Sequence, residues 1–530
     1  MWGAPDEEQA EQTLKALRPE SATGPDLIPT RVLQQCYKEL AKPLTLLARR
    51  VLETGRWPTC WVVHWILPLF KKKQPWAPDN YRGVHLTSQV GKAVERLLQK
   101  SFGKFFGSAE CAGENQFAYR KERGARDLLA LLVLTWLTGF ENGHKFLLYC
   151  SDVSGAFDRV SSQRLLDKLE ALGVPSEWLA VFASWLRERT AQVIVGGAYS
   201  AAMALCDMVF QGTVWGPPLW NSFYKDAKKP VNKAGFKEVV YADDLNAHKA
   251  YPVTVNNSVL YAEGKECQKN LHTWGVANQV CFDPKKESFH VLARAGGEGA
   301  AAELLGVKFD VALAMEDEVH DLVTEVSWKL RTLQRSRRFH TDSELVNLYK
   351  SRVLGYLEYR TPAVYHATSS ALQPLDKLQE RFLREAGVST FEALMAFNLA
   401  PLAARRDVAM LGLIHRCVLG KGPQQFREFF KPADKRQQPN KRLQKKREKH
   451  GRQLQDPRKS SHLNVVRRSA LGLVAVYNLL PAAVVRNTEV KDFQRELQEF
   501  FKKRAEEGEE DWAETFSPRV PLWRHPLLRL

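Results

Sequence analysis

The chain has 530 residues, more than one hydrophobic core usually supports, so two to four structural units are expected. Apolar residues make up 44% and aromatic residues 10% of the sequence, which excludes a disordered protein. Lys and Arg outnumber Asp and Glu by 77 to 60, and this net charge of +17 favours a polyanionic partner such as nucleic acid. A membrane is the weaker alternative, because the best apolar stretch, residues 128–137, is shorter than the roughly 20 residues that span a bilayer.

The eight cysteines are scattered singly, with no CxxC pair and no histidine at ligand spacing. This pattern argues against a zinc site and favours reduced thiols in the nucleus or the cytoplasm. No targeting signal is evident at the start of the chain, "MWGAPDEEQAEQ".

The first part of the chain is predicted to be helical. From Glu7 to about Leu52, apolar residues recur three and four apart, with a break at "SATGPDLIP" and a stop at Gly55. Residues 62–70, "VVHWILPLF", have the length and the β-branched and aromatic content of a buried strand. Lys71, Lys72 and Lys73 follow it. A contact with phosphate and a solvated strand end are equally compatible with these three lysines.

Two later segments are expected to place acidic residues at strand ends. After a buried helix at 126–138, "KFLLYCSDVSGAF" reads as a strand that stops at Asp152, and a helix that starts with serine and ends at Gly173 follows it. "EVVYADDLNAHKAY" reads as two short strands with Asp243 and Asp244 at the bend between them. Beyond Phe309 the pattern is all-helical.

Asp152, Asp243 and Asp244 are candidate metal ligands. Three carboxylates in one place repel one another unless a hard divalent cation such as Mg²⁺ lies between them. Two such ions, roughly 4 Å apart, can activate a 3′ hydroxyl and neutralise a leaving pyrophosphate. An Asp-Asp pair by itself is more often a plain turn, so the doublet alone is a weak signal.

A series of segments, taken in order, resembles the reverse transcriptase of non-LTR (LINE-type) retrotransposons. The segments are "ATGPDLIPTRVL", "GRWPTCWVVHWILPLFKKK", "NYRGVHLTSQVGKAVERLL", "NQFAYRKERGARD", "SDVSGAFDRV", "FQGTVWGPPLWN", "YADD", "FDPKKESFHVL" and "LLGVKFD". Each one is a modest signal, whereas their order along the chain is a strong one.

The resemblance implies an α+β fold of the right-hand polymerase type, with fingers, a palm built on an antiparallel sheet, a helical thumb and a helical C-terminal extension. The expected divisions are an N-terminal helical extension at 1–50, fingers and palm at 51–309, the thumb at 310–430, a basic linker at 431–460 and a C-terminal helical segment at 461–530. The linker carries twelve Lys or Arg against three Asp or Glu, which is typical of an exposed linker or a nucleic-acid-binding arm.

The resemblance also implies roles for the acidic residues. Asp152 and Asp243 would be the main ligands of Mg²⁺, or of Mn²⁺ in its place, with Asp244 as an ancillary carboxylate and the Val153 carbonyl as a backbone ligand. Asp158 is expected to cap or pair locally instead of binding metal.

Further residues are assigned to the nucleotide by the same resemblance. The Phe157 ring would leave no room for a 2′ hydroxyl and so select deoxynucleotides; without the family it would be read as a core aromatic. Gln211 and Gly212 would line the nucleotide pocket, where glycine permits close backbone approach. Arg82 would hold triphosphate oxygens. Lys286 would protonate or neutralise pyrophosphate, with Lys285 as the alternative register.

Contacts to the RNA template and DNA primer are expected from a basic set. For about half of its members beyond Phe309, a merely solvated surface is the alternative. The set comprises Lys71, Lys72, Lys73, Arg120, Trp328, Lys329, Arg331, Arg335, Arg337 and Arg338.

Some positions depart from the family's usual pattern. Trp215 and Trp220 stand in "VWGPPLWN", where bulky indoles are expected to disturb template stacking, and Val84 and His85 replace a Pro-Ile-Ser-like run. No endonuclease is recognisable ahead of the polymerase, which predicts a copy that lacks it.

Three functions are therefore compared. The first is an RNA-directed DNA polymerase that extends a primer with deoxynucleoside triphosphates. The second is a decayed retroelement remnant that only binds nucleic acid. The third is a viral-type RNA-dependent RNA polymerase, which Ala242, where that class usually has glycine, and the aromatic Phe157 argue against.

Overall fold

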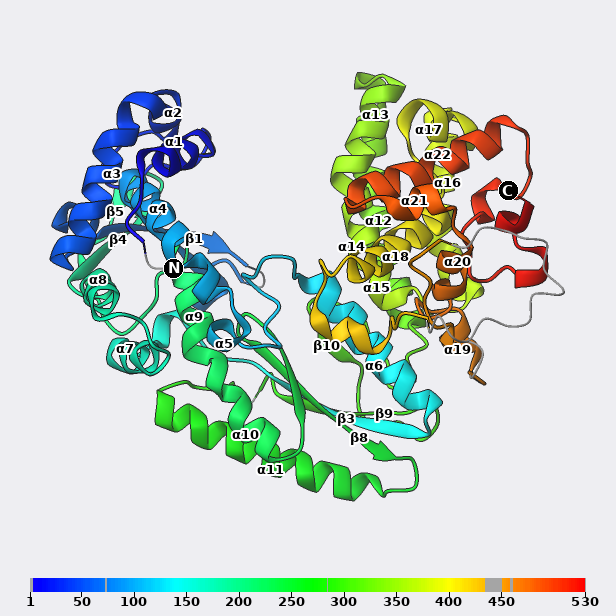
Figure 1. Cartoon of the computed structure of the whole chain (residues 1–530), viewed down its shortest axis with the longest axis horizontal. Coiled ribbons are helices and arrows are strands. Elements are labelled where there is room, and N and C mark those ends of the chain that lie inside the picture. The colour runs from blue at the N-terminus through cyan, green and yellow to red at the C-terminus, as the bar shows by residue number, and fades with distance from the viewer. Residues whose placement is uncertain (1–2, 72–73, 284, 434–449, 458–460, 530) are drawn as a thin grey trace. The chain divides into compact units, whose positions relative to one another are not determined.

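The computed structural model describes residues 3–71, 74–283, 285–433, 450–457 and 461–529. Helices and strands together give a mixed α+β protein (Figure 1). The chain forms two compact units: unit 1 comprises Met1–Lys121, Tyr149–Ala247 and Ala262–Glu287, and unit 2 comprises Glu122–Leu148, His248–Tyr261 and Ser288–Leu530. None of the described helices combines the length and the apolar content that crossing a membrane requires.

The strands form three sheets. The strands are β1 (Val63–Phe70), β2 (Tyr81–Leu86), β3 (His144–Ser151), β4 (Arg189–Val195), β5 (Ala198–Tyr199), β6 (Met203–Leu205), β7 (Lys237–Tyr241), β8 (Asp244–Pro252), β9 (Ser288–Leu292), β10 (Ala302–Leu304) and β11 (Val307–Phe309). One sheet has the order β2-β1-β4-β5, with β6 also paired to β4; a second has the order β7-β8-β3-β9; β10 and β11 form the third.

The described part of unit 1 contains helices from three separate stretches of the chain. They are α1 (Glu7–Lys15), α2 (Thr30–Gln35), α3 (Tyr37–Thr54), α4 (Gln89–Phe106), α5 (Ala109–Ala112), α7 (Ser162–Ala171), α8 (Ser176–Leu186), α9 (Gly216–Tyr224), α10 (Lys228–Lys233) and α11 (Asn257–Asn278), the last of which begins in unit 2. The predicted N-terminal helices are confirmed, and α3 ends at Gly55 in the left-handed conformation that lets the chain leave the helix.

Unit 2 is helical after β11 in the part of the chain that the structure describes. Its helices are α6 (Ala125–Glu141), α12 (Glu316–Arg335), α13 (Asp342–Tyr349), α14 (Gly355–Tyr359), α15 (Thr361–Val364), α16 (Ser369–Ala386), α17 (Thr390–Phe397), α18 (Leu402–Val418), α19 (Asn464–Arg467), α20 (Leu473–Leu479), α21 (Ala482–Arg486) and α22 (Val490–Glu506). The all-helical prediction beyond Phe309 is thereby confirmed. Much of the predicted basic linker, residues 434–449 and 458–460, lies outside the described residues.

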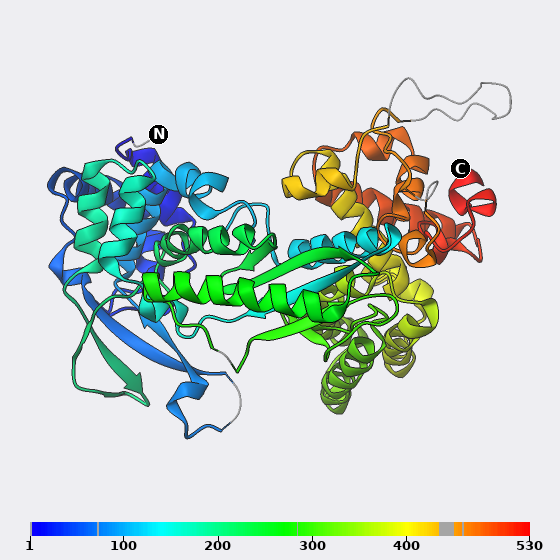
Figure 2. The same cartoon turned by 90° about the horizontal axis from the view of Figure 1, so that it is seen from below.

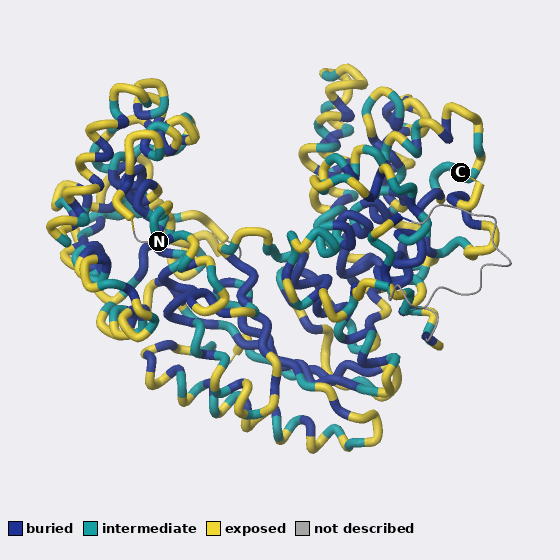
Figure 3. The backbone as a smooth tube through the Cα atoms, viewed as in Figure 1, coloured by how far each residue is buried: buried dark blue, intermediate teal, exposed yellow. Residues whose placement is uncertain are grey.

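The strand predicted at 62–70 exists, but the prediction that it is buried is wrong. Its side chains Leu67, Leu69 and Phe70 are exposed. β1 pairs antiparallel with β2 and parallel with β4, and these strands extend away from the helices of unit 1 (Figure 2). The apolar run therefore reflects strand pairing more than burial, whereas β3 is buried along almost its whole length (Figure 3).

The core of unit 1 is built around tryptophans. The Trp215 indole packs between two others: its ring centroid lies 5.2 Å from that of Trp57 and 5.6 Å from that of Trp185. Phe102 and Phe182 contact the same ring edge-on. Aromatic side chains of this size contribute most of the apolar area that such a core buries.

Candidate functional site

The predicted strand end at Asp152 is confirmed. β3 ends at Ser151, whose hydroxyl donates to the Leu245 carbonyl over 2.9 Å, so the end of β3 is tied to β8 just after the acidic doublet. The next residues pair with the segment around Phe282: the Asp283 amide donates to the Asp152 carbonyl over 3.0 Å, and the Ser154 amide donates to the Cys281 carbonyl over 2.9 Å. Asp152 is thus held by the Ser151 hydroxyl bond before it and by backbone bonds at its own carbonyl and at Ser154.

The doublet follows a residue in an uncommon backbone conformation. β7 ends at Tyr241, β8 begins at Asp244, and Ala242 between them has φ +60°. A left-handed alanine costs roughly 1–2 kcal/mol and persists only where its surroundings hold it.

Two buried side chains hold Ala242 in place. The Gln116 amide oxygen accepts from the Ala242 amide over 2.8 Å, and the Gln116 amide nitrogen donates to the Ala242 carbonyl over 3.1 Å. The Trp220 indole donates to the same carbonyl over 3.0 Å. The sequence did not identify Gln116 or Trp220 as functional residues, although Gln116 is the second residue of the resembling segment "NQFAYRKERGARD".

The three carboxylates act on one another electrostatically. Burial raises the pKa of Asp243, and the Asp152 charge raises it further, while the amide of Asp243 itself, Arg82 and Lys286 oppose the shift. Burial and the charges of Asp243 and Asp152 raise the pKa of Asp244 to about 7. Burial and then the same three carboxylates raise the pKa of Tyr224, whose buried hydroxyl has no hydrogen-bond partner among the described residues. The charges of the three carboxylates therefore act on one another, while their role in binding metal stays a prediction.

Lys286 lies against this cluster. Its ammonium group donates to Asp152 Oδ2 over 2.5 Å and lies 3.6 Å from Asp283 Oδ2. The bond to Asp152 raises the pKa of Lys286. The structure therefore brings Lys286 to Asp152, while the backbone amide of Lys285 bonds to the Asp283 carboxylate.

The next residue anchors this segment. The buried Glu287 carboxylate accepts from the Tyr149 hydroxyl over 2.7 Å and from the amide nitrogen of Gln268 over 2.5 Å, and it lies 2.9 Å from His272 Nε2. Because three groups fix Glu287, the backbone from which Lys286 reaches the cluster is held.

The donor atoms suit a hard divalent cation. Carboxylate and carbonyl oxygens are the ligands of Mg²⁺ and Mn²⁺. Burial and then neighbouring carboxylate charge raise the pKa values of Asp243 and Asp244, and a cation nearby would oppose both shifts. The side chains as arranged do not yet form a ligand set, because no group of three His, Cys, Asp or Glu among the described residues could hold a metal ion. The residues fit such an ion in donor type and charge.

Phe157 connects to the doublet through Trp220. Phe157 lies in a short 3₁₀ turn after Asp152 and is 9% exposed. Its ring stacks on Trp220 with centroids 5.7 Å apart and an interplanar angle of 20°, and Tyr119 meets it edge-on at 6.4 Å. The exposed Asp158 lies in the same turn, and the charges of Lys71 and Arg159 oppose the rise that burial causes in its pKa.

The Gln-Gly segment is bonded to β2. The Gln211 carbonyl accepts from the His85 amide over 2.8 Å. Gly212 has φ +105°, and a Cβ there would lie 2.8 Å from the His85 carbonyl oxygen, so only glycine fits. Arg82 is three residues earlier on the same strand, and its charge opposes the rise in the pKa of Asp243. The structure thus joins the Gln-Gly segment to the strand that carries Arg82.

The prediction that Trp215 and Trp220 disturb a template is wrong. Both side chains are 0% exposed. The Trp215 indole donates to the Glu95 carbonyl over 2.9 Å, and the Glu95 carboxylate accepts from Trp185 and from the Val214 amide over 2.8 and 2.7 Å. Trp215 therefore belongs to the core of unit 1, and Trp220 packs against Phe157 and Tyr224 and bonds to the Ala242 carbonyl.

The predicted nucleic-acid contacts divide into three groups. Lys72 and Lys73 lie outside the described residues, and Lys71 is exposed after β1. Arg120 is engaged within the protein, since its guanidinium donates to the Gly113 and Gly107 carbonyls over 2.6 and 3.0 Å.

The third group lies on α12 and the turn that follows it. Lys329 is half-buried and pairs with Glu325 over 3.8 Å, with its ammonium 3.8 Å from the Tyr356 ring centroid. The exposed members are Trp328, Arg331, Arg335, Arg337 and Arg338. Trp328, Arg331 and Arg335 recur at helical spacing, which places them on one face of α12.

Comparison with known proteins identifies the class of this domain. A family model described as "Reverse transcriptase (RNA-dependent DNA polymerase)" matches residues 70–309. The match contains the acidic cluster, Phe157, the Gln-Gly segment and Lys286. Residues 70–309 are therefore similar to the reverse transcriptase family.

The similar proteins found by sequence comparison are polymerases of mobile elements. The chain is 27% identical over 405 residues to the RNA-directed DNA polymerase from mobile element jockey of Drosophila melanogaster, covering 71% of this chain and 43% of that protein. It is 23% identical over 383 residues to the probable RNA-directed DNA polymerase from transposon X-element of the same species, covering 68% and 42%. The chain is thus related to the polymerases of non-LTR (LINE-type) mobile elements and spans less than half the length of these relatives.

Proposed function

We propose that this chain is an RNA-directed DNA polymerase that extends a primer 3′ hydroxyl with deoxynucleotides on an RNA template. The observation that carries the proposal is that the charges of Asp152, Asp243 and Asp244 act on one another at the ends of adjacent strands, within residues 70–309, which are similar to the reverse transcriptase family. The right-hand arrangement is part of the proposal, with residues 51–309 as fingers and palm and 310–430 as the thumb.

In this proposal Asp152, Asp243, Asp244 and the Val153 carbonyl would hold Mg²⁺, or Mn²⁺ in its place. Such ions, when bound, activate the primer hydroxyl and neutralise the developing charge of pyrophosphate. Two-metal nucleotidyl transfer requires a second ion at the same carboxylates, for which the carboxylate charge of the cluster is the support.

Other residues would orient the nucleotide. Arg82 would bind triphosphate oxygens, and Gln211 and Gly212 would lie against the nucleotide with backbone groups. Lys286, which is 61% exposed at its side chain, can leave Asp152 and place its ammonium group on the leaving pyrophosphate. The Phe157 ring would exclude a 2′ hydroxyl and is supported from behind by Trp220.

A specific observation favours the second candidate function, a remnant that binds nucleic acid without catalysis. Lys286 bonds to Asp152, and the described residues do not form a three-ligand set. In a remnant, this ion pair would be a permanent replacement for the cation.

Primer extension separates the two functions. The purified chain is given an RNA template, a DNA primer and deoxynucleoside triphosphates with Mg²⁺, and binding of the same template–primer is measured by fluorescence anisotropy. A polymerase incorporates nucleotides with Mg²⁺ and stops when EDTA is added. Tight binding without incorporation, in Mg²⁺ and in Mn²⁺, would leave only the remnant.

A further inference from the structure

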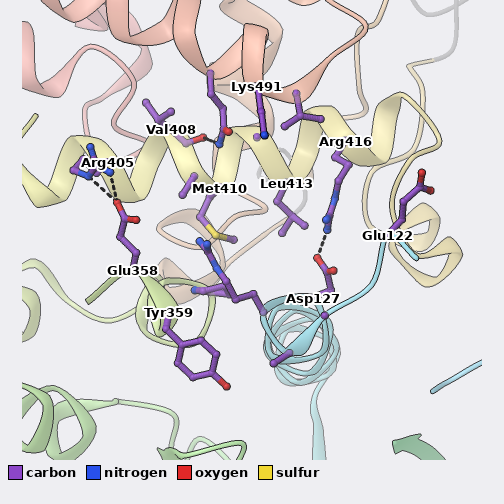
Figure 4. Close-up of a pocket in the computed structure, with 18 of the residues that line it drawn as sticks. Glu122, Asp127, Glu358, Tyr359, Arg405, Val408, Met410, Leu413, Arg416 and Lys491 are labelled. Carbon is purple, nitrogen blue, oxygen red and sulfur yellow. Dashed lines mark hydrogen bonds and ion pairs between the residues drawn. The ribbon is translucent and has the colours of Figure 1, made fainter. Parts of the chain in front are cut away.

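A pocket of about 880 Å³ lies within unit 2, apart from the acidic cluster, which belongs to unit 1. Its walls come from the loop and first turn of α6, from α14 and α15, from the middle of α18 and from the start of α22 (Figure 4). Its volume is in the range of sites that bind small molecules or short pieces of a polymer. We refer to it as the basic pocket.

The lining is rich in positive charge. Six cations and three anions line the basic pocket: Arg123, Arg126, Arg405, Arg416, Lys491 and Arg495 against Glu122, Asp127 and Glu358. A concave surface with an excess of three positive charges attracts anions more strongly than the same charges on a convex surface.

Two of the three anions are already neutralised within the wall. Arg416 pairs with Asp127, and Arg405 donates through Nε to Glu358 Oε1 over 2.7 Å (Figure 4). Arg416 still has a buried Nε with no hydrogen-bond partner among the described residues. An orphaned buried donor costs about 1–3 kcal/mol, so a ligand that accepts a hydrogen bond there is favoured.

Two of the cations remain available. Arg126 and Lys491 are exposed and form no ion pair within the described part of the chain. Arg126 lies in the first turn of α6 and Lys491 in the first turn of α22. They approach the basic pocket from two helices that are about 365 residues apart in sequence, so the site exists only in the folded unit.

Both helix starts add to the attraction. α6 and α22 each have 17 residues, and neither the Gly124 nor the Glu489 N-cap makes a side-chain cap. The first amides of a helix lack intrahelical partners and carry partial positive charge, which suits phosphate oxygens. The helix starts, the free cations and the orphaned Arg416 Nε point to the same ligand chemistry.

We propose that the basic pocket binds the phosphodiester backbone of a single-stranded nucleic acid segment. The apolar part of the lining, which includes Met410, Leu413 and the Tyr359 ring, offers surfaces for sugars and bases. Lys491 and Arg495 are one helical turn apart along the wall, and Arg495 pairs with Asp492 over 2.9 Å at an exposed position. This spacing suits successive phosphates of a strand better than a single phosphate group. This site gives α22 of the C-terminal helical segment a role that is separate from nucleotide addition.

The first test is the salt dependence of binding. A fluorescein-labelled 20-nucleotide RNA is titrated with the full chain, and the log of the affinity is followed against the log of salt concentration. Each lost phosphate contact reduces the slope by about 0.7 for a single strand, which is about fivefold in affinity at 0.1 M salt. The double variant Arg126→Glu/Lys491→Glu is expected to lose about 25-fold in affinity and about 1.4 in slope.

A charge-matched control lies on the same helix. Lys503 is on α22, its side chain is 74% exposed and it does not line the basic pocket. Lys503→Glu therefore changes the net charge by the same amount as Lys491→Glu, at a position outside the pocket. Lys503→Glu is expected to change affinity by less than about twofold. Equal losses in Lys491→Glu and Lys503→Glu would overturn the proposal, because a general charge effect would then explain both.

A second measurement locates the strand. The same RNA with 5-iodouridine substitutions is cross-linked by light to the full chain, and the attached peptides are identified by mass spectrometry. Cross-links to peptides that contain residues 122–127 or 490–498, lost in the double variant, support the assignment. RNA cross-links confined to other peptides would contradict the proposal, because the pocket would then hold no strand. Protection of these peptides by AMP, with RNA affinity unchanged, would also contradict it, because the pocket would then bind a free nucleotide.

Discussion

We expect Gln116 to hold the conformation of the backbone just before Asp243 and Asp244. The variant Gln116→Leu tests this expectation. Leucine is similar in size but removes both polar atoms from a side chain that is 4% exposed. The amides of Ala242 and Ala118, which now donate to Gln116 over 2.8 and 3.0 Å, would lose their acceptor. Two orphaned buried donors cost about 1–3 kcal/mol each, so the free energy of unfolding should fall by about 2–6 kcal/mol.

The same variant should slow nucleotide addition. Without Gln116, Ala242 can leave its left-handed conformation, and the neighbouring Asp243 moves with it. A displacement of about 1 Å at a reacting centre can lower the rate about 100-fold, so single-turnover incorporation at saturating nucleotide should fall by about this factor while the RNA affinity stays within twofold.

Gln89→Leu is the matched control for this variant. Gln89 is also a buried glutamine of unit 1, and its amide nitrogen donates to the Ala22 carbonyl over 2.5 Å, away from the doublet. It should lower the urea midpoint without a comparable loss of rate. If Gln116→Leu folds and incorporates nucleotides as fast as Gln89→Leu, the positioning argument is wrong.

Three further predictions concern other parts of the chain. Phe157→Val should admit ribonucleotides, seen as at least a tenfold smaller ratio of deoxy- to ribonucleotide kcat/KM; an unchanged ratio would return Phe157 to a purely core role. Gly212→Ala should cost about 2 kcal/mol through its clash with the His85 carbonyl and its positive φ, whereas Gly103→Ala, at an open helical position, should stabilise by about 0.5–1 kcal/mol; equal urea midpoints for the two variants would contradict this. Burial lowers the pKa of His366 to about 4. The unfolded chain takes up this proton near pH 6.5 and the folded chain only near pH 4, so about 3 kcal/mol of stability is fully present above pH 6.5 and is lost as the pH falls towards 4; His366→Gln should flatten the urea midpoint across this range, and an unchanged pH profile would refute the assignment.

The local features of the fold were predictable from sequence. The strand end at Asp152, the bend at Asp243 and Asp244, and the stop of α3 at Gly55 each depend on a short pattern of apolar, small and acidic residues. The prediction that the three carboxylates gather supposed that strand ends meet, and the structure places β3 beside β8 in one sheet.

The remaining features depend on long-range packing. Gln116 and Ala242 are 126 residues apart, and Trp215 and Glu95 are 120 apart. A single sequence does not indicate such partners, which is why Gln116 was missed and why Trp215 and Trp220 were wrongly expected to crowd a template. β1 was wrongly expected to be buried because strand propensity also reflects pairing with neighbouring strands.

The central claim is that the acidic cluster performs nucleotide addition, and a matched pair of substitutions tests it most directly. Asp243→Asn removes one charge from the cluster, and Asp158→Asn removes one from the exposed turn nearby. With Mg²⁺, an RNA template and a DNA primer, we expect Asp243→Asn to abolish incorporation while RNA affinity stays within about twofold, and Asp158→Asn to keep most of the wild-type rate. Undiminished DNA synthesis by Asp243→Asn would contradict the account.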